Sequence, residues 1–228
     1  MSGERAEDDL SSDSAIVPGS SHARLIRFNN LTRSRFESTL GWLAAEVLPT
    51  LAALAGYQSI FLGTDPENER AIGLTFWDSL TTLKQGERVE RPLREEAMRR
   101  SGGTQNESLL EIYQVQTAIG STAKPTHARF FRWEGLSVER GRSGNELYRN
   151  EIVPSVATLP GFAGTISASD FLSGKMLGLY LWDGAETMLG SFDWERDAAT
   201  RLGLLEGPHR PVLIDSYEVA TAPELAIS

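Results

Sequence analysis

The chain has 228 residues, a formal net charge of −9 at pH 7 and no cysteine. This acidic balance argues against a nucleic-acid partner and against docking on an anionic membrane, because both need a basic surface. Without cysteine there can be no disulfide, thiolate nucleophile or zinc–thiolate site. Hydrophobic residues make up 40% of the chain, which is enough for a buried core.

The two ends of the chain are polar. Residues 1–20 are rich in Ser, Asp, Glu and Gly, which predicts a disordered tail, and we expect a second tail at 221–228. The most apolar segment, Trp42 to Tyr57, is interrupted by Glu46 and Pro49 and is too short to cross a bilayer. We therefore expect a soluble, cytoplasmic protein with no membrane partner.

The chain repeats itself at a displacement of 105 residues. His22-Ala-Arg-Leu-Ile-Arg27 recurs as His127-Ala-Arg-Phe-Phe-Arg132, and Phe76-Trp77-Asp78 recurs as Leu181-Trp182-Asp183. A match that holds over most of each half indicates an internal duplication. The pattern predicts two domains, 21–118 and 127–220, joined by a linker at 119–126.

Within each repeat the elements follow one order. Apolar residues at helical spacing indicate helices, and short alternating runs bounded by turn residues indicate strands. The first repeat is predicted to contain a strand, a helix, a hairpin of two strands, a second helix and a last strand: Arg24–Asn29, Phe36–Leu54, Ile60–Thr64, Ala71–Trp77, Leu80–Arg100 and Leu109–Val115. The helix before the hairpin should kink at Pro49.

This βαββαβ order is that of a ferredoxin-like unit, whose sheet has helices on one face only. Two such sheets can cover each other's open faces. The predicted fold is therefore α+β, with two ferredoxin-like repeats packed sheet to sheet as a pseudo-dimeric α/β barrel.

Strand alternation gives a prediction of which residues face the second sheet. We expect the uniformly aliphatic sets of the third strands to lie under the helices. The sets that contain Thr75 and Trp77, and Tyr180 and Trp182, should then line a pocket between the sheets.

Two arginines on the first strands also belong to the predicted inter-sheet side, together with Tyr113 and Tyr217. Arg27 could pair with Glu111, and Arg132 with Asp215, as cross-strand ion pairs. One interpretation is a structural pair that satisfies buried charge, and the other is an anion-binding arginine beside a carboxylate base. The duplication favours the structural interpretation.

Leu159-Pro160-Gly161-Phe162 after a helix, followed by a hairpin that ends in Leu181-Trp182-Asp183, resembles the dimeric α/β-barrel superfamily. The nearest subgroup is the antibiotic biosynthesis monooxygenase-like domains, and the resemblance covers both repeats. The resemblance implies one of the several activities found in this superfamily. They are those of cofactor-free oxygenases of polyketide anthrones, polyketide cyclases, haem-degrading enzymes and haem peroxidases, and the superfamily also includes domains without known activity.

The cofactor-free oxygenases are similar in using an Asn near the first strand and a Trp at the end of the third. Asn29, Trp77 and Trp182 match these places and are the catalytic candidates, although Glu134 stands where Asn29 would recur. A Trp there can equally be packing. The substrate-binding candidates are Arg27, Tyr113, Arg132, Tyr180 and Tyr217.

Haem is the cofactor to weigh, and its usual protein ligands are His, Cys or Tyr. We expect His22 and His127 to face solvent, whereas His209 could approach the barrel mouth. No second His lies at metal-ligand spacing, so we expect neither metal nor cofactor, with haem as the alternative.

The leading hypothesis is a small-molecule enzyme that oxygenates an aromatic, polyketide-like substrate without a cofactor. The alternatives are a polyketide cyclase, a haem-binding protein and a non-catalytic binding module. A cavity of roughly 300 Å³ or more between the sheets would favour a ligand site, whereas a filled space there would favour the binding module. Assembly into a homo-oligomer is left open.

Overall fold

The computed structural model describes residues 21–31, 33–102, 104–105, 110–204 and 211–221. The first repeat contains β1 His22–Asn29, α1 Arg33–Trp42, η1 Leu43–Val47, α2 Leu48–Ala52, β2 Tyr57–Asp65, β3 Arg70–Trp77, α3 Leu80–Ser101, β4 Thr104–Gln105 and β5 Glu111–Gly120. The second contains β6 His127–Trp133, α4 Val138–Leu147, η3 Tyr148–Ile152, α5 Val153–Val156, β7 Phe162–Asp170, β8 Lys175–Trp182, α6 Ala185–Gly190, α7 Phe192–Arg201 and β9 Pro211–Thr221. The predicted tails, apart from Thr221, lie outside the described residues.

Eight antiparallel strands close into one barrel. The first repeat pairs its strands in the order β5-β1-β3-β2, and the second in the order β7-β8-β6-β9. Pairing of β2 with β9 and of β5 with β7 joins the two sheets. The ferredoxin-like repeats and the pseudo-dimeric barrel are thus confirmed.

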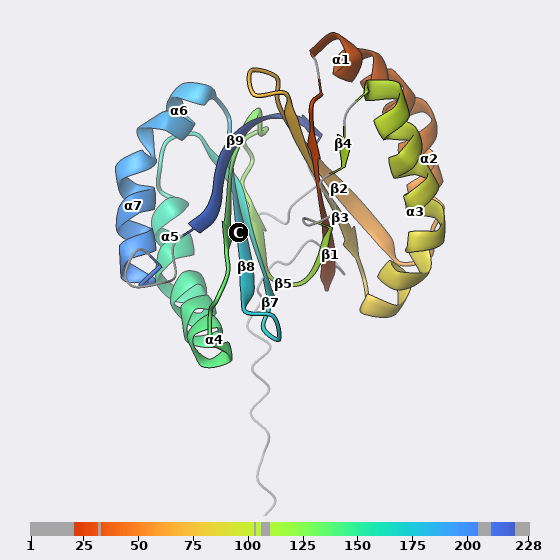
Figure 1. The fold of residues 1–228 in the computed structure, drawn as a ribbon. Helices are drawn as coiled ribbons and strands as arrows, with labels where there is room; N and C mark the ends of the chain where they lie inside the picture. The colour runs from red at the N-terminus through yellow and green to blue at the C-terminus, as the bar shows by residue number, and fades with distance from the viewer. Residues whose placement is uncertain (1–20, 32, 103, 106–109, 205–210, 222–228) are drawn as a thin grey trace, which may run out of the picture.

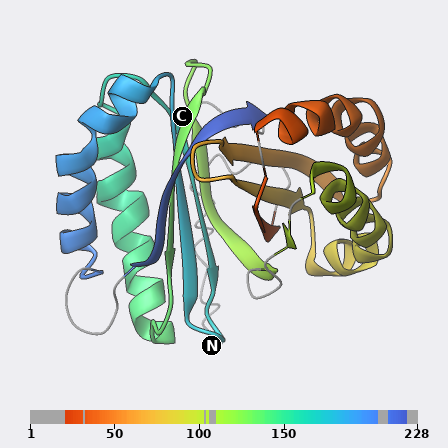
Figure 2. The ribbon, with the colours of Figure 1, turned by 45° about the horizontal axis from the view of Figure 1, so that its top comes forward.

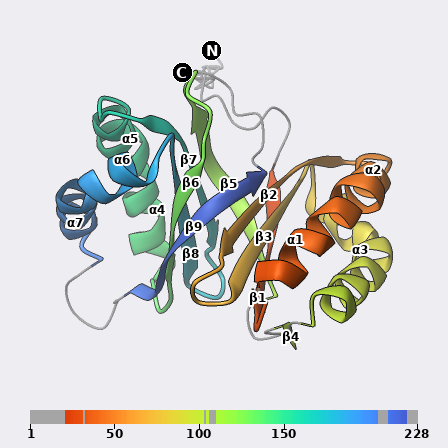
Figure 3. The ribbon, with the colours of Figure 1, turned by 90° about the horizontal axis from the view of Figure 1, so that it is seen from above.

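The helices cover the outside of the barrel. Those of the first repeat lie on one side and those of the second repeat on the other, with the two sheets between them (Figures 1 and 2). Because every neighbouring pair of strands is antiparallel, the β2–β3 and β7–β8 turns belong to the same end of the barrel. Both turns point to the bottom of the view in Figure 3.

The strand β5 is longer than predicted. It continues through Ile119 and Gly120, which pair with Thr165 and Gly164 of β7. These two residues were expected in the linker. They lie in a strand because this part of β5 forms the seam between the repeats.

The predicted assignment of the strand faces is wrong. Leu177, Leu179 and Leu181 of β8 lie in the barrel interior, whereas Tyr180 and Trp182 pack beneath the helices of their repeat. Both faces of each sheet are buried, so alternation separates two sets of residues without showing which set is inside. In β8 the barrel interior takes the aliphatic set, alongside rings from other strands such as Phe130 and Tyr113, and the helix-covered face takes Tyr180 and Trp182.

In each repeat the described residues include a π-helical turn that ends two residues before a proline. The N–H of Leu48 donates to the carbonyl of Leu43, and the N–H of Val153 donates to the carbonyl of Tyr148. The following residues, Pro49 and Pro154, have no N–H and cannot continue the regular pattern of bonds. The kink predicted at Pro49 therefore takes the form of a widened helical turn.

A buried arginine anchors the second helical segment of each repeat to its sheet. Arg24 of β1 donates to the carbonyl of Leu83 at 2.8 Å and forms an ion pair with Glu90 of α3. At the equivalent position, Arg129 forms an ion pair with Glu195 at 3.4 Å. These contacts fix the spacing between the helices and the sheet.

Gly86 of α3 allows the helix to approach Trp77, because a Cβ at Gly86 would clash with the indole ring. We expect the Gly86→Ala variant to lose about 1–3 kcal/mol of unfolding free energy through overpacking. Gly41 of α1 has no atom within 4 Å of its Cβ position, so Gly41→Ala should gain up to about 1 kcal/mol from helix propensity. Urea unfolding of both variants checks the opposite signs, and a stabilised Gly86→Ala protein would contradict the packing.

Candidate functional site

A cavity of about 280 Å³ lies between the first sheet and its helices. Its wall consists of Ile26, Phe28, Leu31, Thr39, Leu40, Leu43, Ala44, Val47, Leu48, Ile60, Leu62, Ala71, Gly73, Thr75, Ala97, Ser101 and Ala220. The small residues Ala71, Gly73 and Thr75 of β3 leave room beneath the helices, where larger side chains would fill the space. The volume is close to the lower end of the range for drug-sized ligands.

The wall of the cavity is almost entirely apolar. Thr39, Thr75 and Ser101 supply its polar side chains, and none of the wall residues given above is titratable. Such a site can exclude water and hold an apolar molecule through burial of its surface. The described wall offers no acid or base for proton transfer.

Trp77 lies behind this wall. Its Nε1 donates to the Thr75 hydroxyl at 3.1 Å, and its ring packs edge-to-face against Tyr57 with 5.6 Å between centroids. The indole is fully buried. Trp77 therefore reaches the cavity through Thr75 rather than through its own surface.

The equivalent space in the second repeat is filled by its own side chains. Tyr148, Met176 and Tyr180 stand where the first repeat has Leu43, Ala71 and Thr75, and all three are buried. A cavity of only about 20 Å³ lies beside Tyr180. Of these two equivalent spaces, the one in the first repeat is open.

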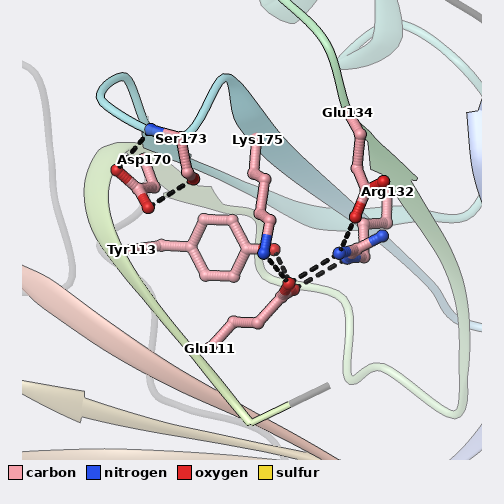
Figure 4. Close-up of polar contacts among 7 residues, drawn as sticks. All are labelled: Glu111, Tyr113, Arg132, Glu134, Asp170, Ser173 and Lys175. Carbon is pink, nitrogen blue, oxygen red and sulfur yellow. Dashed lines mark hydrogen bonds and ion pairs between the residues drawn. The ribbon is translucent and has the colours of Figure 1, made fainter. Parts of the chain in front are cut away.

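A second group of candidate residues forms a polar cluster around Glu111 (Figure 4). Its carboxylate accepts from Nε of Arg132 at 2.7 Å, from Nη2 of Arg132 at 2.6 Å and from the Tyr113 hydroxyl at 2.5 Å. Lys175 also donates to it at 2.5 Å, and Glu134 binds Arg132 from the solvent side. We call Glu111, Tyr113, Arg132 and Lys175 the Glu111 cluster.

The protonation states in the Glu111 cluster are fixed. Burial alone would raise the pKa of Glu111, but hydrogen bonds from Arg132, Lys175 and Tyr113 outweigh it and lower the pKa to about 2. Burial and the bond to Glu111 raise the pKa of Tyr113 well above its usual value. A carboxylate that is ionised near neutral pH and already accepts hydrogen bonds from three side chains is a poor general base.

The symmetry-related cluster is built around Asp215. Its carboxylate binds Arg27 at 3.1 Å, Arg70 at 2.6 Å and the Tyr217 hydroxyl at 3.0 Å. Arg70 also binds Asp65 at 2.5 Å. In this cluster, as in the Glu111 cluster, the carboxylate and the tyrosine come from one repeat and the two cations from the other.

The predicted ion-pair partners are therefore wrong. Arg27 pairs with Asp215 instead of Glu111, and Arg132 pairs with Glu111 instead of Asp215. The reason is barrel closure, which brings each carboxylate to the hairpin of the other repeat. In both clusters the charges hold the two repeats together, in agreement with the structural interpretation.

The remaining candidates do not meet in one place. Asn29 pairs with Arg70 at the last residue of β1, whereas Trp77 pairs with His22 at the first. Tyr113 and Tyr217 face the packed barrel interior, and Tyr180 and Trp182 lie beneath the helices of the second repeat. Among the described residues the space between the sheets is packed with side chains, and the cavity lies under the helices of the first repeat instead. The sequence signal for this cavity was the small Thr75 of the first repeat, which stands where the second repeat has the large Tyr180.

The cavity does not fit haem. Its described wall has no His, Cys or Tyr to bind iron and no cation to meet the two carboxylates of a haem. His22 and His127 bond instead to the neighbouring hydroxyls of Ser21 and Thr126. His209 lies outside the described residues.

No protein-family model matches the chain. Two uncharacterized proteins of Mycobacterium tuberculosis, MT2634 and Rv2557, are each 22% identical over 146 residues. Each match covers 62% of this chain and 62% of the relative's length.

Solved structures match over nearly the whole chain. A proposed monooxygenase from Fusobacterium nucleatum is 12% identical with a TM-score of 0.59, and the match covers 90% of this chain and 94% of that one. An anthrone oxidase-like protein is 13% identical with a TM-score of 0.58, covering 89% and 92%. The chain therefore shares the dimeric α/β-barrel fold of these monooxygenase-like proteins. Another proposed monooxygenase with this barrel, from Lactobacillus acidophilus, is 10% identical with a TM-score of 0.57, covering 91% and 96%.

Among the residues that the structure describes, none of the helices is both long and apolar enough to cross a bilayer.

Proposed function

We propose that the protein binds a small apolar molecule in the cavity of its first repeat. The observation that carries this proposal is the 280 Å³ cavity with its nearly continuous apolar wall. Burial of apolar surface contributes roughly 25 cal/mol per Å², so such a site can bind without any charged contact. The monooxygenase-like barrels with the same fold make a small-molecule ligand the natural expectation.

A second candidate is oxygenation of an anthrone-like ligand without a cofactor, as the anthrone oxidase-like neighbour suggests. The Thr75–Trp77 hydrogen bond favours it, because the Thr75 hydroxyl can donate its own hydrogen to a ligand oxygen. In this reaction the ligand CH₂ group is oxidised and dioxygen is reduced, which gives a ketone and water. The described wall has no base, so the acceptor of the ligand's proton must lie outside the wall residues given above.

The test combines binding with dioxygen uptake, using a simple anthrone and the purified protein. Binding that is lost in Thr75→Tyr, while Tyr180→Phe in the second repeat binds normally, supports the ligand site. Uptake above the spontaneous rate that is also lost in Thr75→Tyr adds the oxygenase activity. Binding without uptake leaves a binding module or a cyclase, which consumes no dioxygen. Equal binding by Thr75→Tyr would contradict the proposed site.

A further inference from the structure

The two repeats have equivalent spaces beneath their helices. The space is open in the first repeat and filled by side chains in the second. The helix-facing positions of the two repeats correspond one to one along the strands and the π-helical turn. Several of them enlarge in the second repeat: Ile26 to Phe131, Phe28 to Trp133, Leu43 to Tyr148, Ala71 to Met176, and Thr75 to Tyr180. Gly73 and Gly178 correspond without change, so the backbone framework is shared. The filled site therefore shows which groups this framework accepts.

Aromatic rings occupy the filled site, where Phe131 packs edge-to-face on Tyr180 with 5.8 Å between centroids and stacks on Trp133 at 5.5 Å. The rings of Tyr148 and Tyr180 lie 6.2 Å apart between centroids, with their planes tilted by 45°. Trp194 packs edge-to-face on Tyr180 at 5.7 Å. Burial raises the pKa of Tyr148 to about 12, so the ring enters the site as a neutral phenol. The tyrosine rings that fill this space are neutral, and the carboxylate of Glu195 beside Tyr180 is paired with Arg129.

The open site lacks the polar partner that the filled site provides. The Tyr148 hydroxyl bonds to Thr165 at 2.5 Å, but the first repeat has Ile60 at the position of Thr165. A ligand in the first repeat therefore meets only aliphatic surface at that point. A charged group placed there would lose its hydration without a compensating contact, which costs several kcal/mol.

We propose that the first repeat binds one neutral ligand with at least two aromatic rings, and that the second repeat binds none because Tyr148 and Tyr180 take the place of those rings. This inference rests on the proposed ligand site and adds its ligand class, its stoichiometry and the residues that set its size. Positions 43, 71 and 75 contribute to keeping the site open, together with positions 26 and 28.

A matched pair of probes tests the ligand class. N-phenyl-1-naphthylamine and 8-anilino-1-naphthalenesulfonate share one ring skeleton and differ by the sulfonate. Fluorescence titration should give one molecule of the neutral probe per chain. Affinity for the sulfonate should be at least about tenfold lower, since that ratio corresponds to only 1.4 kcal/mol.

Variants that copy the second repeat test the location. Leu43→Tyr and Ala71→Met should each weaken binding of the neutral probe by about tenfold or more. Tyr180→Phe, which lies in the second repeat and outside this cavity, is the control and should bind normally. Circular dichroism and a thermal melt report whether each variant folds. If Leu43→Tyr does not fold, the smaller change Ala71→Met decides the question.

The outcomes separate this inference from the function on which it rests. Equal affinity for both probes overturns the neutral ligand class and leaves the ligand site standing. Two molecules per chain overturn the closed second site. Binding unaffected by Leu43→Tyr and Ala71→Met, or no binding of either probe, overturns both proposals.

Discussion

The Glu111→Ala variant is expected to lose about 3–5 kcal/mol of unfolding free energy, because it leaves a buried Arg132 and a half-buried Lys175 without their shared carboxylate. Glu134 provides the matched control, since it binds the same arginine but its side chain is 44% exposed. Glu134→Ala should cost less than about 1 kcal/mol. Urea unfolding measures both, and equal losses would contradict the buried role of Glu111.

The same cluster predicts a pH dependence of stability. The folded-state pKa of Glu111 is lowered to about 2 from an ordinary value of 4.5. Its ionised form therefore contributes about 3 kcal/mol that is fully present above the ordinary pKa and is lost as the pH falls toward 2. The Glu111→Gln variant should lack this part of the acid sensitivity. An unchanged slope of stability against pH in that variant would refute the assignment.

The second large effect concerns the two duplicated tryptophans. We expect Trp77→Ala and Trp182→Ala each to lose about 3–5 kcal/mol of unfolding free energy, because both rings are fully buried under the helices. Urea unfolding tests this directly. Unchanged stability together with lost turnover of a substrate would instead indicate a catalytic Trp77.

Phenylalanine substitutions separate packing from hydrogen bonding. Trp77 donates to Thr75, whereas Nε1 of Trp182 has no hydrogen-bond partner among the described residues. Trp77→Phe should therefore cost about 1 kcal/mol more than Trp182→Phe. Equal costs would show that the Thr75 contact contributes nothing to stability.

The order of elements and the duplication were accessible from the sequence, because periodicity and turn residues are local signals. The Pro49 kink, the turn at Gly56 after the helix and the hairpin closed by Asp65 all depend on residues close in the chain. Asp65, for example, accepts from the backbone of Asn68 within its own turn. Such contacts need no knowledge of the other repeat.

The site could not be predicted in the same way, because it depends on which face of the sheet turns inward. The alternation of Leu179 and Tyr180 separates the residues of the two faces. Because both faces are buried, it does not show which face lies inside the barrel. The partner of Arg27 depends likewise on the other repeat, since Asp215 reaches it only when the barrel closes. These contacts are set by long-range packing.

The crossed clusters around Glu111 and Asp215 have a consequence for how this barrel can vary. In a barrel assembled from two copies of one polypeptide, any substitution would be present twice, once in each half. Here a single chain carries both halves, joined through residues 121–126. A mutation therefore acts once, so one half can give up an internal space and gain packing while its partner keeps that space. In the fused chain two equivalent positions can therefore change independently, whereas in a homodimer they would always change together.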